Sequence, residues 1–269
     1  MRRLCLAEIH DQSWFPPFLR DEVTDALQAI FDFAGVYDPI CGRLRSALEA
    51  AGTNKVLDLC SGAGGPWPRL IRSFNRESSA IEVQLTDKYP HAALGLSTER
   101  CDGVHLCSQS IDATNIPAEL CGFRTIFSSF HHFEPLEARA ILQDSVNRGQ
   151  GIAIFESAGR HVVTIVLIFL IPLTDWILTP FLRPFRWSRL LFTYLIPVIP
   201  FVLWCDGIVS CLRAYSMKEL AELTEGLTGQ QYRWEKGEER TGFFAVPITY
   251  LVGYATPGPS RIDAGKPAR

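Results

Sequence analysis

Two neighbouring histidines, His131 and His132, follow an apolar run and are flanked by phenylalanines. Imidazole titrates close to neutral pH, so either side chain is a candidate for the base that removes a proton from a reacting hydroxyl or ammonium group. A second interpretation gives the pair a purely structural role, in which it shapes a binding pocket. Alternation out of a strand does not decide which histidine faces a cavity, so both are catalytic candidates.

A glycine-rich turn follows an earlier apolar run that carries an acid. The run is Lys55–Leu59 with Asp58 inside it, and the turn after it contains Cys60, Gly62 and Gly64. Because glycine lacks a Cβ, a ligand can lie close against such a turn. A strand, a glycine turn and a following helix are typical of a nucleotide-type site at the carboxyl end of parallel strands.

Three aspartates follow successive apolar runs, namely Asp58, Asp87 and Asp112. An ionised carboxylate has two acceptor oxygens, so an acid after the second strand can bind both hydroxyls of a ribose. An acid after the third strand can meet the amino group of an adenine. A single aspartate is more often a turn former or a helix cap, but three in register after a glycine turn predict a nucleotide-type ligand.

Strand and helix candidates alternate along the chain, which predicts a parallel sheet with crossover helices. The expected strands are Lys55–Leu59, Ile81–Thr86, Gly103–Ser108, Arg124–Ser129 and Gly151–Glu156. The expected helices are Arg69–Phe74, His91–Glu99, Pro135–Asn147 and Met217–Leu227. Two further strands, Gln230–Glu235 and Phe243–Tyr254, predict a closing hairpin that adds an antiparallel strand.

The order of these segments resembles the class I S-adenosylmethionine-dependent methyltransferases over roughly residues 50–157. The resemblance rests on Val-Leu-Asp-Leu-Cys-Ser-Gly-Ala-Gly-Gly, Leu-Thr-Asp-Lys, Ile-Asp-Ala-Thr-Asn-Ile-Pro and Ile-Phe-Ser-Ser-Phe-His-His-Phe. It implies a Rossmann-like α/β fold with a seven-stranded, mostly parallel sheet and an antiparallel C-terminal strand. One departure is Cys60, which stands where the family has the first glycine of its turn.

The same resemblance implies S-adenosyl-L-methionine as the cofactor and assigns roles to matching residues. The methionine end of the cofactor would lie against Asp58, Gly62 and Gly64, with Cys60 in the turn. Asp87 would hold the ribose, with Lys88 beside it. Asp112 and Ala113 would flank the adenine, and the segment from Ser128 to His131 would form the wall below the sulfonium. A dinucleotide site is disfavoured, because Trp67 stands where that motif, started at Gly62, needs its last glycine.

Two apolar runs, Val162–Leu182 and Leu190–Trp204, flank a basic and aromatic segment. A bilayer span needs about 20 uninterrupted apolar residues, and Asp175 and several prolines break these runs, so a two-span anchor is disfavoured. One interpretation is a lid over an apolar pocket, with or without contacts in a homodimer. The other lays 162–204 on a membrane surface. Both place an apolar acceptor near the site.

The predicted organisation is an N-terminal helical cap over 1–50, a catalytic domain over 51–256 with an insertion at 160–206, and a mobile tail over 257–269. Four residues outside the cofactor motifs are substrate-contact candidates: Trp14, Tyr37, Asp206 and Tyr215. Core packing is the alternative for Trp14 and Tyr37. A buried pair between Asp206 and Arg213 that anchors the lid is the alternative for Asp206.

Composition narrows the function further. The chain has 269 residues, a formal net charge of −3 and eight cysteines. This charge gives no reason to expect a nucleic-acid partner. Isolated cysteines favour reduced thiols and therefore a cytoplasmic protein. Peripheral association with a membrane, through residues 162–204, is the alternative location. No Cys/His spacing suggests a metal. The charged start, with Glu8, His10 and Asp11, does not predict a signal peptide.

The sequence therefore predicts an enzyme that transfers a methyl group from S-adenosylmethionine to oxygen or nitrogen of a small, apolar or lipid-like acceptor. Two alternatives stay open. In one, the bound sulfonium promotes another reaction, such as a cyclisation. In the other, the fold serves binding or assembly without catalysis. The acceptor and the attacked atom are not predicted.

Overall fold

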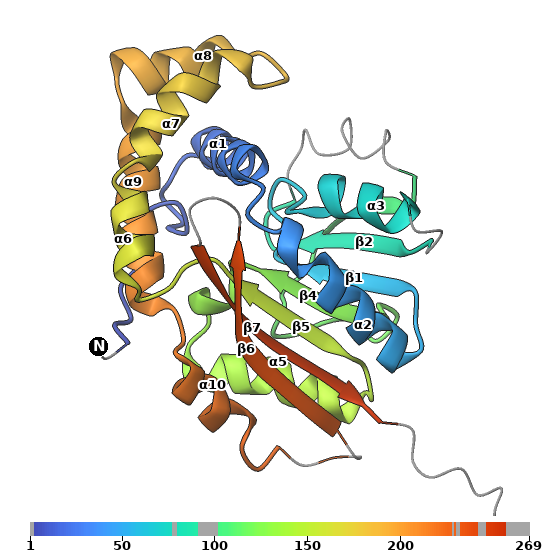
Figure 1. The fold of residues 1–269 in the computed structure, drawn as a ribbon. Helices are drawn as coiled ribbons and strands as arrows, with labels where there is room; N and C mark the ends of the chain where they lie inside the picture. Colours follow the sequence, from blue (N-terminus) through green and yellow to red (C-terminus); the bar gives the residue numbers. More distant parts are fainter. Residues whose placement is uncertain are drawn as a thin grey trace, which may run out of the picture.

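The computed structural model describes residues 3–76, 80–90, 102–227, 229, 232–241 and 246–256. A seven-stranded sheet with the order β3-β2-β1-β4-β5-β7-β6 forms its centre (Figure 1). Strands β1 to β5 are parallel, β7 is antiparallel to β5, and β6 is antiparallel to β7. The mostly parallel sheet with an antiparallel C-terminal strand is thus confirmed.

The strands are β1 Lys55–Leu59, β2 Glu82–Asp87, β3 Val104–Ser110, β4 Phe123–Phe127, β5 Ile152–Glu156, β6 Tyr232–Thr241 and β7 Val246–Ala255. The α-helices are α1 Pro17–Ala34, α2 Cys41–Ala51, α3 Trp67–Arg76, α5 Pro135–Asn147, α6 Val162–Ile168, α7 Ile171–Leu178, α8 Trp187–Leu190, α9 Val198–Arg213 and α10 Met217–Thr224. The shorter helices are η1 Asp38–Ile40, η2 Phe130–His132, η3 Thr179–Phe181 and η4 Leu191–Leu195.

Helices cover both faces of the sheet, which explains the continuous apolar character of its central strands. Every residue of β4 and β5 is buried. One face packs its side chains with α2 and α3, as at Leu44 and Phe74. The other face packs with α5 and α10, as at Leu142 and Leu220. The chain order reverses between β1 and β4, and the carboxyl ends of these strands form the edge where open α/β sheets bind ligands.

Several boundaries differ from the sequence-based expectation. Strand β4 ends at Phe127 because Ser128 adopts a left-handed backbone with φ of 43°. Strand β6 continues to Thr241, six residues beyond the expected Glu235, since it pairs along the whole of β7. Helix α10 ends at Thr224 instead of the expected Leu227, because the backbone of the next residue, Glu225, is extended. The predicted helix His91–Glu99 and the predicted tail 257–269 lie outside the described residues.

The N-terminal helices contribute to different parts of the molecule. Helix α1 lies over the carboxyl edge of the sheet and packs against α7 and α9 (Figure 1). Helix α2 instead belongs to the core of the sheet, through Leu44 and Leu48. The division of the chain at residue 50 stays a prediction, and the packing shows that α2 shares the core of the domain that follows it.

The apolar insertion forms α6, α7, η3, α8, η4 and α9, which stand beside the end of the sheet (Figure 1). Helix α9 extends to Arg213, beyond the predicted end at residue 206. Among the described residues, no single helix is long and apolar enough to cross a bilayer, and two strongly bent helix pairs within 162–213 meet that test only as pairs.

Candidate active site

A cavity of about 890 Å³ opens at the carboxyl edge of the sheet. It is bordered by the glycine turn after β1, by the ends of β2 and β4, by α1 and by the insertion. Gly62, Asp87 and Asp112 all line it, so the three segments identified in the sequence meet at one site. The further predicted residues along this cavity are Tyr37, Cys60, Lys88, Ala113, Ser128, His131, His132 and Asp206.

The glycine turn and the acid after β2 are directly connected. The backbone N–H of Gly62 donates to Asp87 Oδ2 over 2.8 Å, and Asp87 Oδ1 accepts from the backbone of Tyr89 over 2.7 Å. Helix α1 closes against the same turn. A Cβ on Gly62 would lie 3.1 Å from the Thr24 methyl group, and Gln28 donates to the carbonyl of Gly65 over 2.6 Å. The close approach explains why glycine is needed at position 62.

Cys60 adopts the backbone conformation that the missing glycine would favour. Its φ is 58°, in the left-handed region, which L-residues other than glycine occupy at an energetic cost. Burial raises the pKa of its thiol, and the carboxylates of Asp87 and Asp58 add to that effect. The thiol is therefore protonated at neutral pH and adds a small side chain to the cavity wall.

Lys88 and Asp112, which the sequence predicts to lie beside the ribose and the adenine, form an ion pair at the cavity. Lys88 Nζ lies 3.1 Å from Asp112 Oδ2. The other oxygen of Asp112 accepts hydrogen bonds from the hydroxyl and the backbone N–H of Thr114. The Thr114 hydroxyl, then the Thr114 backbone and Lys88, lower the pKa of Asp112 and outweigh burial, which raises it. Ala113 is buried beside this pair. The carboxylate is thus ionised and able to accept a hydrogen bond from a ligand.

Asp58 and Gly64 do not line the cavity and lie behind its wall. Asp58 is 1% exposed and accepts a hydrogen bond from the Thr125 hydroxyl over 2.5 Å. Burial raises its pKa to about 7, although hydrogen bonds from its neighbours oppose the shift. Asp58 therefore supports the turn from beneath, and its predicted contact with the methionine end stays a prediction.

Tyr37 and Ser128 belong to a hydrogen-bonded chain at the end of β4. The Tyr37 hydroxyl bonds to Ser128 Oγ, which lies 2.6 Å from Ser157 Oγ. The Tyr37 ring is 5% exposed and packs edge-on against Phe127 and Phe31. The side chain thus packs in the core, and because Tyr37 also borders the cavity its predicted contact with a substrate stays a prediction.

His131 is buried between two carboxylates. Its Nδ1 lies 2.6 Å from Glu156 Oε2, and its Nε2 lies 3.4 Å from Glu8 Oε1. Burial by itself lowers the pKa of the imidazole, but the charges of Glu156 and Glu8 outweigh it and raise the pKa to about 10. His131 therefore carries a proton at neutral pH, which leaves it unsuited to act as a base.

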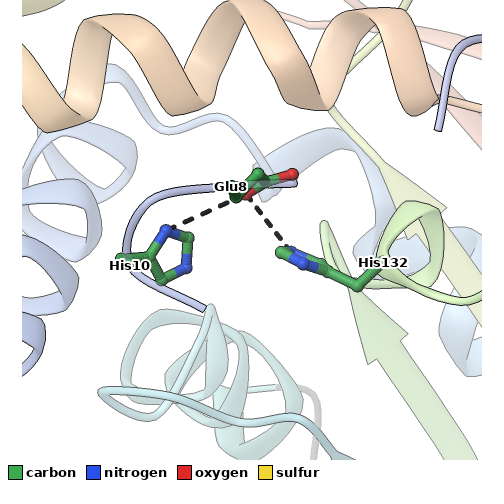
Figure 2. A group of neighbouring side chains, drawn as sticks. All are labelled: Glu8, His10 and His132. Atoms are coloured by element: carbon green, nitrogen blue, oxygen red, sulfur yellow. Dashed lines mark ion pairs between the residues drawn. The ribbon is translucent and has the colours of Figure 1, made fainter. Parts of the chain in front are cut away.

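His132 lies closer to solvent and contacts the N-terminal segment. Its Nδ1 is 2.6 Å from Asp11 Oδ2, while its Nε2 lies 3.7 Å from Glu8 Oε2. His10 approaches the same carboxylate oxygen, with its Nδ1 at 3.9 Å (Figure 2). Burial opposes the ionisation of Glu8, yet the charges of the three histidines outweigh it and lower the pKa to about 2. A buried, ionised carboxylate thus faces three imidazoles.

Asp206 and Arg213 hold the N-terminal segment in place, and Tyr215 binds the loop after η2. Asp206 accepts from the backbone of Ile9 and His10, and it does not form the expected pair with Arg213. Arg213 instead donates to the carbonyls of Leu6, His131 and His132. The Tyr215 hydroxyl donates to the carbonyl of Phe133 over 2.8 Å, outside the cavity lining.

Trp14 also lies away from the cavity. Its side chain is 70% exposed and contacts the ring of Phe15 edge-on. No contact of the described residues supports a substrate role for Trp14 or Tyr215. The remaining substrate candidates, Tyr37 and Asp206, do border the cavity.

The insertion supplies the apolar wall of the cavity. Its lining residues include Leu167, Ile168, Leu170, Ile171 and Leu203. The inner side of the insertion also packs on α1, where Val23 and Ile30 join Ile199 and Val202 in one cluster. The insertion therefore borders one side of the cavity, and its role as a lid stays a prediction.

Sequence reasoning missed Glu8, His10 and Asp11 as site residues and gave little weight to Glu156. The first three are within four positions of one another and lie about 120 residues before the histidine pair, so no motif spacing connects them. The high density of ionisable groups in this N-terminal segment is the one sequence feature that could have indicated a site there. Thr24 and Gln28, which close on the glycine turn, carried no signal.

No family model matches the sequence, and no curated protein matches it significantly. Solved structures do match. One is an O-methyltransferase from neocarzinostatin biosynthesis in complex with S-adenosylmethionine and 2-hydroxy-5-methyl naphthoic acid, at 13% identity and a TM-score of 0.50, covering 89% of this chain and 58% of that one. Its complex with S-adenosyl-L-homocysteine and 1,4-dihydroxy-2-naphthoic acid, also at 13% identity with the same coverage, gives a TM-score of 0.51.

A third match is a putative Zn-dependent alcohol dehydrogenase from Rhodobacter sphaeroides, at 15% identity and a TM-score of 0.50, covering 89% of this chain and 98% of that one. The match to the O-methyltransferase from neocarzinostatin biosynthesis covers only 58% of that protein, so this chain spans little more than half of its length. At these identities the likeness is one of fold. The chain has the Rossmann-like fold of the class I S-adenosylmethionine-dependent methyltransferases, and its chemistry has to be argued from the site.

Proposed function

We propose that this protein is an enzyme that transfers a methyl group from S-adenosyl-L-methionine to an oxygen or nitrogen atom of a small, apolar acceptor. The observation that supports it most is that the glycine turn, Asp87 and Asp112 line one cavity together with a histidine–carboxylate cluster. The first three suit an adenosyl cofactor, and the cluster lies where the acceptor's polar group would bind.

The cofactor half of the proposal assigns one contact to each segment. The methionine end lies along the turn at Gly62, the ribose hydroxyls bind Asp87, and the adenine lies beside Asp112 and Ala113. A solved structure of similar fold is a complex with S-adenosylmethionine, which supports an adenosyl cofactor for this fold. The backbone bonds that fix Asp87 leave its carboxylate pre-positioned, so little ordering is needed on binding.

The acceptor half rests on the contrast between the two walls of the cavity. The insertion contributes aliphatic side chains, such as Leu167 and Ile171, while Glu8, His10 and His132 supply the polar groups. An acceptor with an apolar body and one polar end fits this division. Methyl transfer is an in-line displacement, and holding the reactants in line removes roughly 7–11 kcal/mol of the barrier.

His132 is the member of the histidine pair that we assign to the acceptor. His131 lies between Glu156, at 2.6 Å from its Nδ1, and Glu8, at 3.4 Å from its Nε2, so we assign it the role of holding Glu8 in position. His132 has its Nδ1 on Asp11 and its Nε2 toward the cluster. It acts on the acceptor either as a base or as the ligand of a cation, and a metal titration separates the two.

We further propose that the outer surface of the insertion lies on a lipid bilayer. Large apolar side chains are exposed there on successive helices, including Val162, Phe169, Phe181, Trp187 and Leu195. Exposed apolar patches of this kind are uncommon on soluble monomers. Arg183 is exposed beside them, while Arg186 and Arg189 pair with Asp25 of α1. A lipid-like acceptor would then reach the cavity from the membrane.

The test of the proposed function is turnover. The full chain is incubated with S-adenosylmethionine and with small-molecule extracts, and products are searched for a gain of one methyl group by mass spectrometry. Formation of S-adenosylhomocysteine that depends on an extract supports the proposal. Tight cofactor binding without any methylated product contradicts it and favours a different reaction or a binding role.

A further inference from the structure

Three possible ligand atoms for a metal converge on one side of the cavity. Glu8 and His10 come from the N-terminal segment, and His132 comes from η2 (Figure 2). Glu8 Oε2 lies 3.7 Å from His132 Nε2 and 3.9 Å from His10 Nδ1. One ligand atom from each residue lies within 4.8 Å of the other two. Two imidazoles and one carboxylate therefore share a small volume.

The surrounding residues orient these groups as they do around metal ions. A metal-bound histidine usually donates its other ring N–H to a carboxylate, which fixes the ring. His132 Nδ1 lies 2.6 Å from Asp11 Oδ2, so that its Nε2 is directed at Glu8. Glu8 Oε1 accepts from the Ser210 hydroxyl over 3.1 Å and faces His131 Nε2 at 3.4 Å. Its Oε2 is thereby left to the other two imidazoles.

Burial adds a second argument. The Glu8 side chain is 1% exposed, and its ion pairs among the described residues are all with histidines. Buried charges are paired or bind metals, and Glu8 Oε2 has a ring nitrogen of both His10 and His132 within 4 Å. His131 Nε2 is buried and makes no hydrogen bond within the described part of the chain. The cluster thus places a buried carboxylate and two imidazole nitrogens close enough to share one cation.

We propose that Glu8, His10 and His132 bind a divalent transition-metal ion in the wall of the cavity. Two imidazoles and a carboxylate suit zinc, iron, cobalt or nickel better than calcium or magnesium. A tetrahedral ion with bonds of about 2.0–2.1 Å needs ligand atoms about 3.3 Å apart. Two of the three distances between ligand atoms are 3.7 and 3.9 Å and the third lies within 4.8 Å, so the side chains would close around the ion. Asp11, Asp206 and His131 are positioning residues.

Asp206 completes the surroundings of His10. Its Oδ2 lies 2.7 Å from His10 Nδ1, on the same side as Glu8. When a cation takes that nitrogen, Asp206 Oδ2 still accepts a hydrogen bond of 3.1 Å from the backbone N–H of His10 and so holds the segment that carries this ligand. The site also borders the cavity, because Glu8, His10, His132 and Asp206 all line it. A remaining coordination position is therefore reachable by a ligand in the cavity.

If the protein transfers a methyl group as proposed, the metal site also indicates the class of acceptor. A cation with a free position facing the cavity binds an oxygen atom of the acceptor and orients it toward the cofactor. The acceptor class is then an apolar molecule with a metal-binding oxygen, such as a hydroxyl beside a carbonyl. Metal binding itself does not depend on this function, so the two ideas can fail separately.

The test is a metal titration of the full chain after treatment with a chelator and gel filtration. Zinc and cobalt chlorides are added, the stoichiometry is measured by calorimetry and by elemental analysis, and the cobalt spectrum reports the ligand field. We expect one ion per chain. We also expect affinity to fall with acid, because bound histidines must lose their protons. Absence of stoichiometric binding to the folded wild-type chain would overturn the proposal.

Variants locate the site. His132→Gln and His10→Gln should each weaken binding by about 100-fold, and Asp11→Asn by about 10–100-fold, as for other residues that orient a ligand. His105→Gln, on an exposed position of β3, is the matched control and should bind like the wild type. Unchanged binding in His132→Gln, with its fold verified by circular dichroism, would overturn the assignment.

Cofactor affinity is measured on the same samples. Retained S-adenosylmethionine binding without metal binding refutes the metal site alone. Metal binding without cofactor binding refutes the proposed function and leaves the metal site standing.

Discussion

The backbone N–H of Gly62 donates a hydrogen bond of 2.8 Å to Asp87 Oδ2, which joins the glycine turn after β1 to the carboxyl end of β2. The bond fixes the carboxylate at the cavity before any ligand arrives. It also connects two of the segments on which the cofactor proposal depends. A ribose that binds here would share Asp87 with the turn.

Replacement of Asp87 by alanine tests this contact. We expect S-adenosylmethionine and S-adenosylhomocysteine to bind about 1–3 kcal/mol more weakly, because a buried hydroxyl–carboxylate bond is lost. The matched control is Glu82→Gln at the opposite end of β2, where the side chain forms a surface pair with Lys55 at 3.8 Å. Calorimetry on both variants measures the difference. Equal affinities in the two variants would remove Asp87 from the site.

Cys60 offers a test of the strained turn. Its φ of 58° costs a side-chain-bearing residue about 1–2 kcal/mol. Cys60→Gly should therefore change the free energy of unfolding by no more than about 1 kcal/mol, since relief of strain offsets the greater freedom of glycine in the unfolded chain. Cys60→Val should lose about 2 kcal/mol or more, because β-branched residues fit this conformation poorly.

Urea unfolding of these two variants provides the comparison. Cys107→Val on strand β3 is the control, since β-branched residues suit an extended strand. Equal stability of Cys60→Val and Cys107→Val would show that position 60 does not require a left-handed backbone.

The sequence predicted the sheet and the cofactor side of the cavity, because these depend on local patterns. Apolar runs such as Lys55–Leu59 form strands, and an acid at the end of a parallel strand reaches the same edge as its neighbours. The acceptor side depends on contacts between distant segments. Glu8 meets His131 across about 120 positions of sequence, where Arg213 binds the carbonyls of both Leu6 and His131, and no local pattern predicts that contact.

Asp58 predicts a specific pH dependence. Burial raises its folded-state pKa to about 7 from an ordinary value of 3.8. Between these values the folded chain holds a proton that the unfolded chain releases, so this group's contribution to stability is full below about pH 4 and is lost as pH rises toward 7. Asp58→Asn removes the titration while an amide oxygen can still accept from Thr125.

The measurement compares wild type and Asp58→Asn by urea unfolding at pH 5.5 and pH 8. The free energy of unfolding of the wild type, relative to the variant, should fall by about 2 kcal/mol between the two conditions. The subtraction cancels the other titrating groups. A difference that is the same at both pH values would mean that Asp58 titrates normally.

The outer surface of the insertion can be tested with two aspartate substitutions. Phe181 and Trp187 are 74% and 78% exposed, so Phe181→Asp and Trp187→Asp should leave the fold intact. We expect the wild type to float with liposomes that contain anionic lipids and the double variant to stay in solution. Leu136→Asp, at a residue that is 84% exposed on α5, is the control and should float like the wild type.

Two results would contradict the membrane assignment. One is a wild-type chain that fails to float. The other is flotation that the double variant retains. A wild-type chain that fails to float and elutes as a dimer, with a monomeric double variant, would assign the surface to contacts between two copies instead.

The most direct test of the central claim is a calorimetric titration of the full chain with S-adenosylmethionine, followed by competition with S-adenosylhomocysteine and with NAD. The account predicts one binding site per chain, displacement by S-adenosylhomocysteine, and no effect of NAD. Absence of S-adenosylmethionine binding, or displacement of it by NAD, would contradict the account.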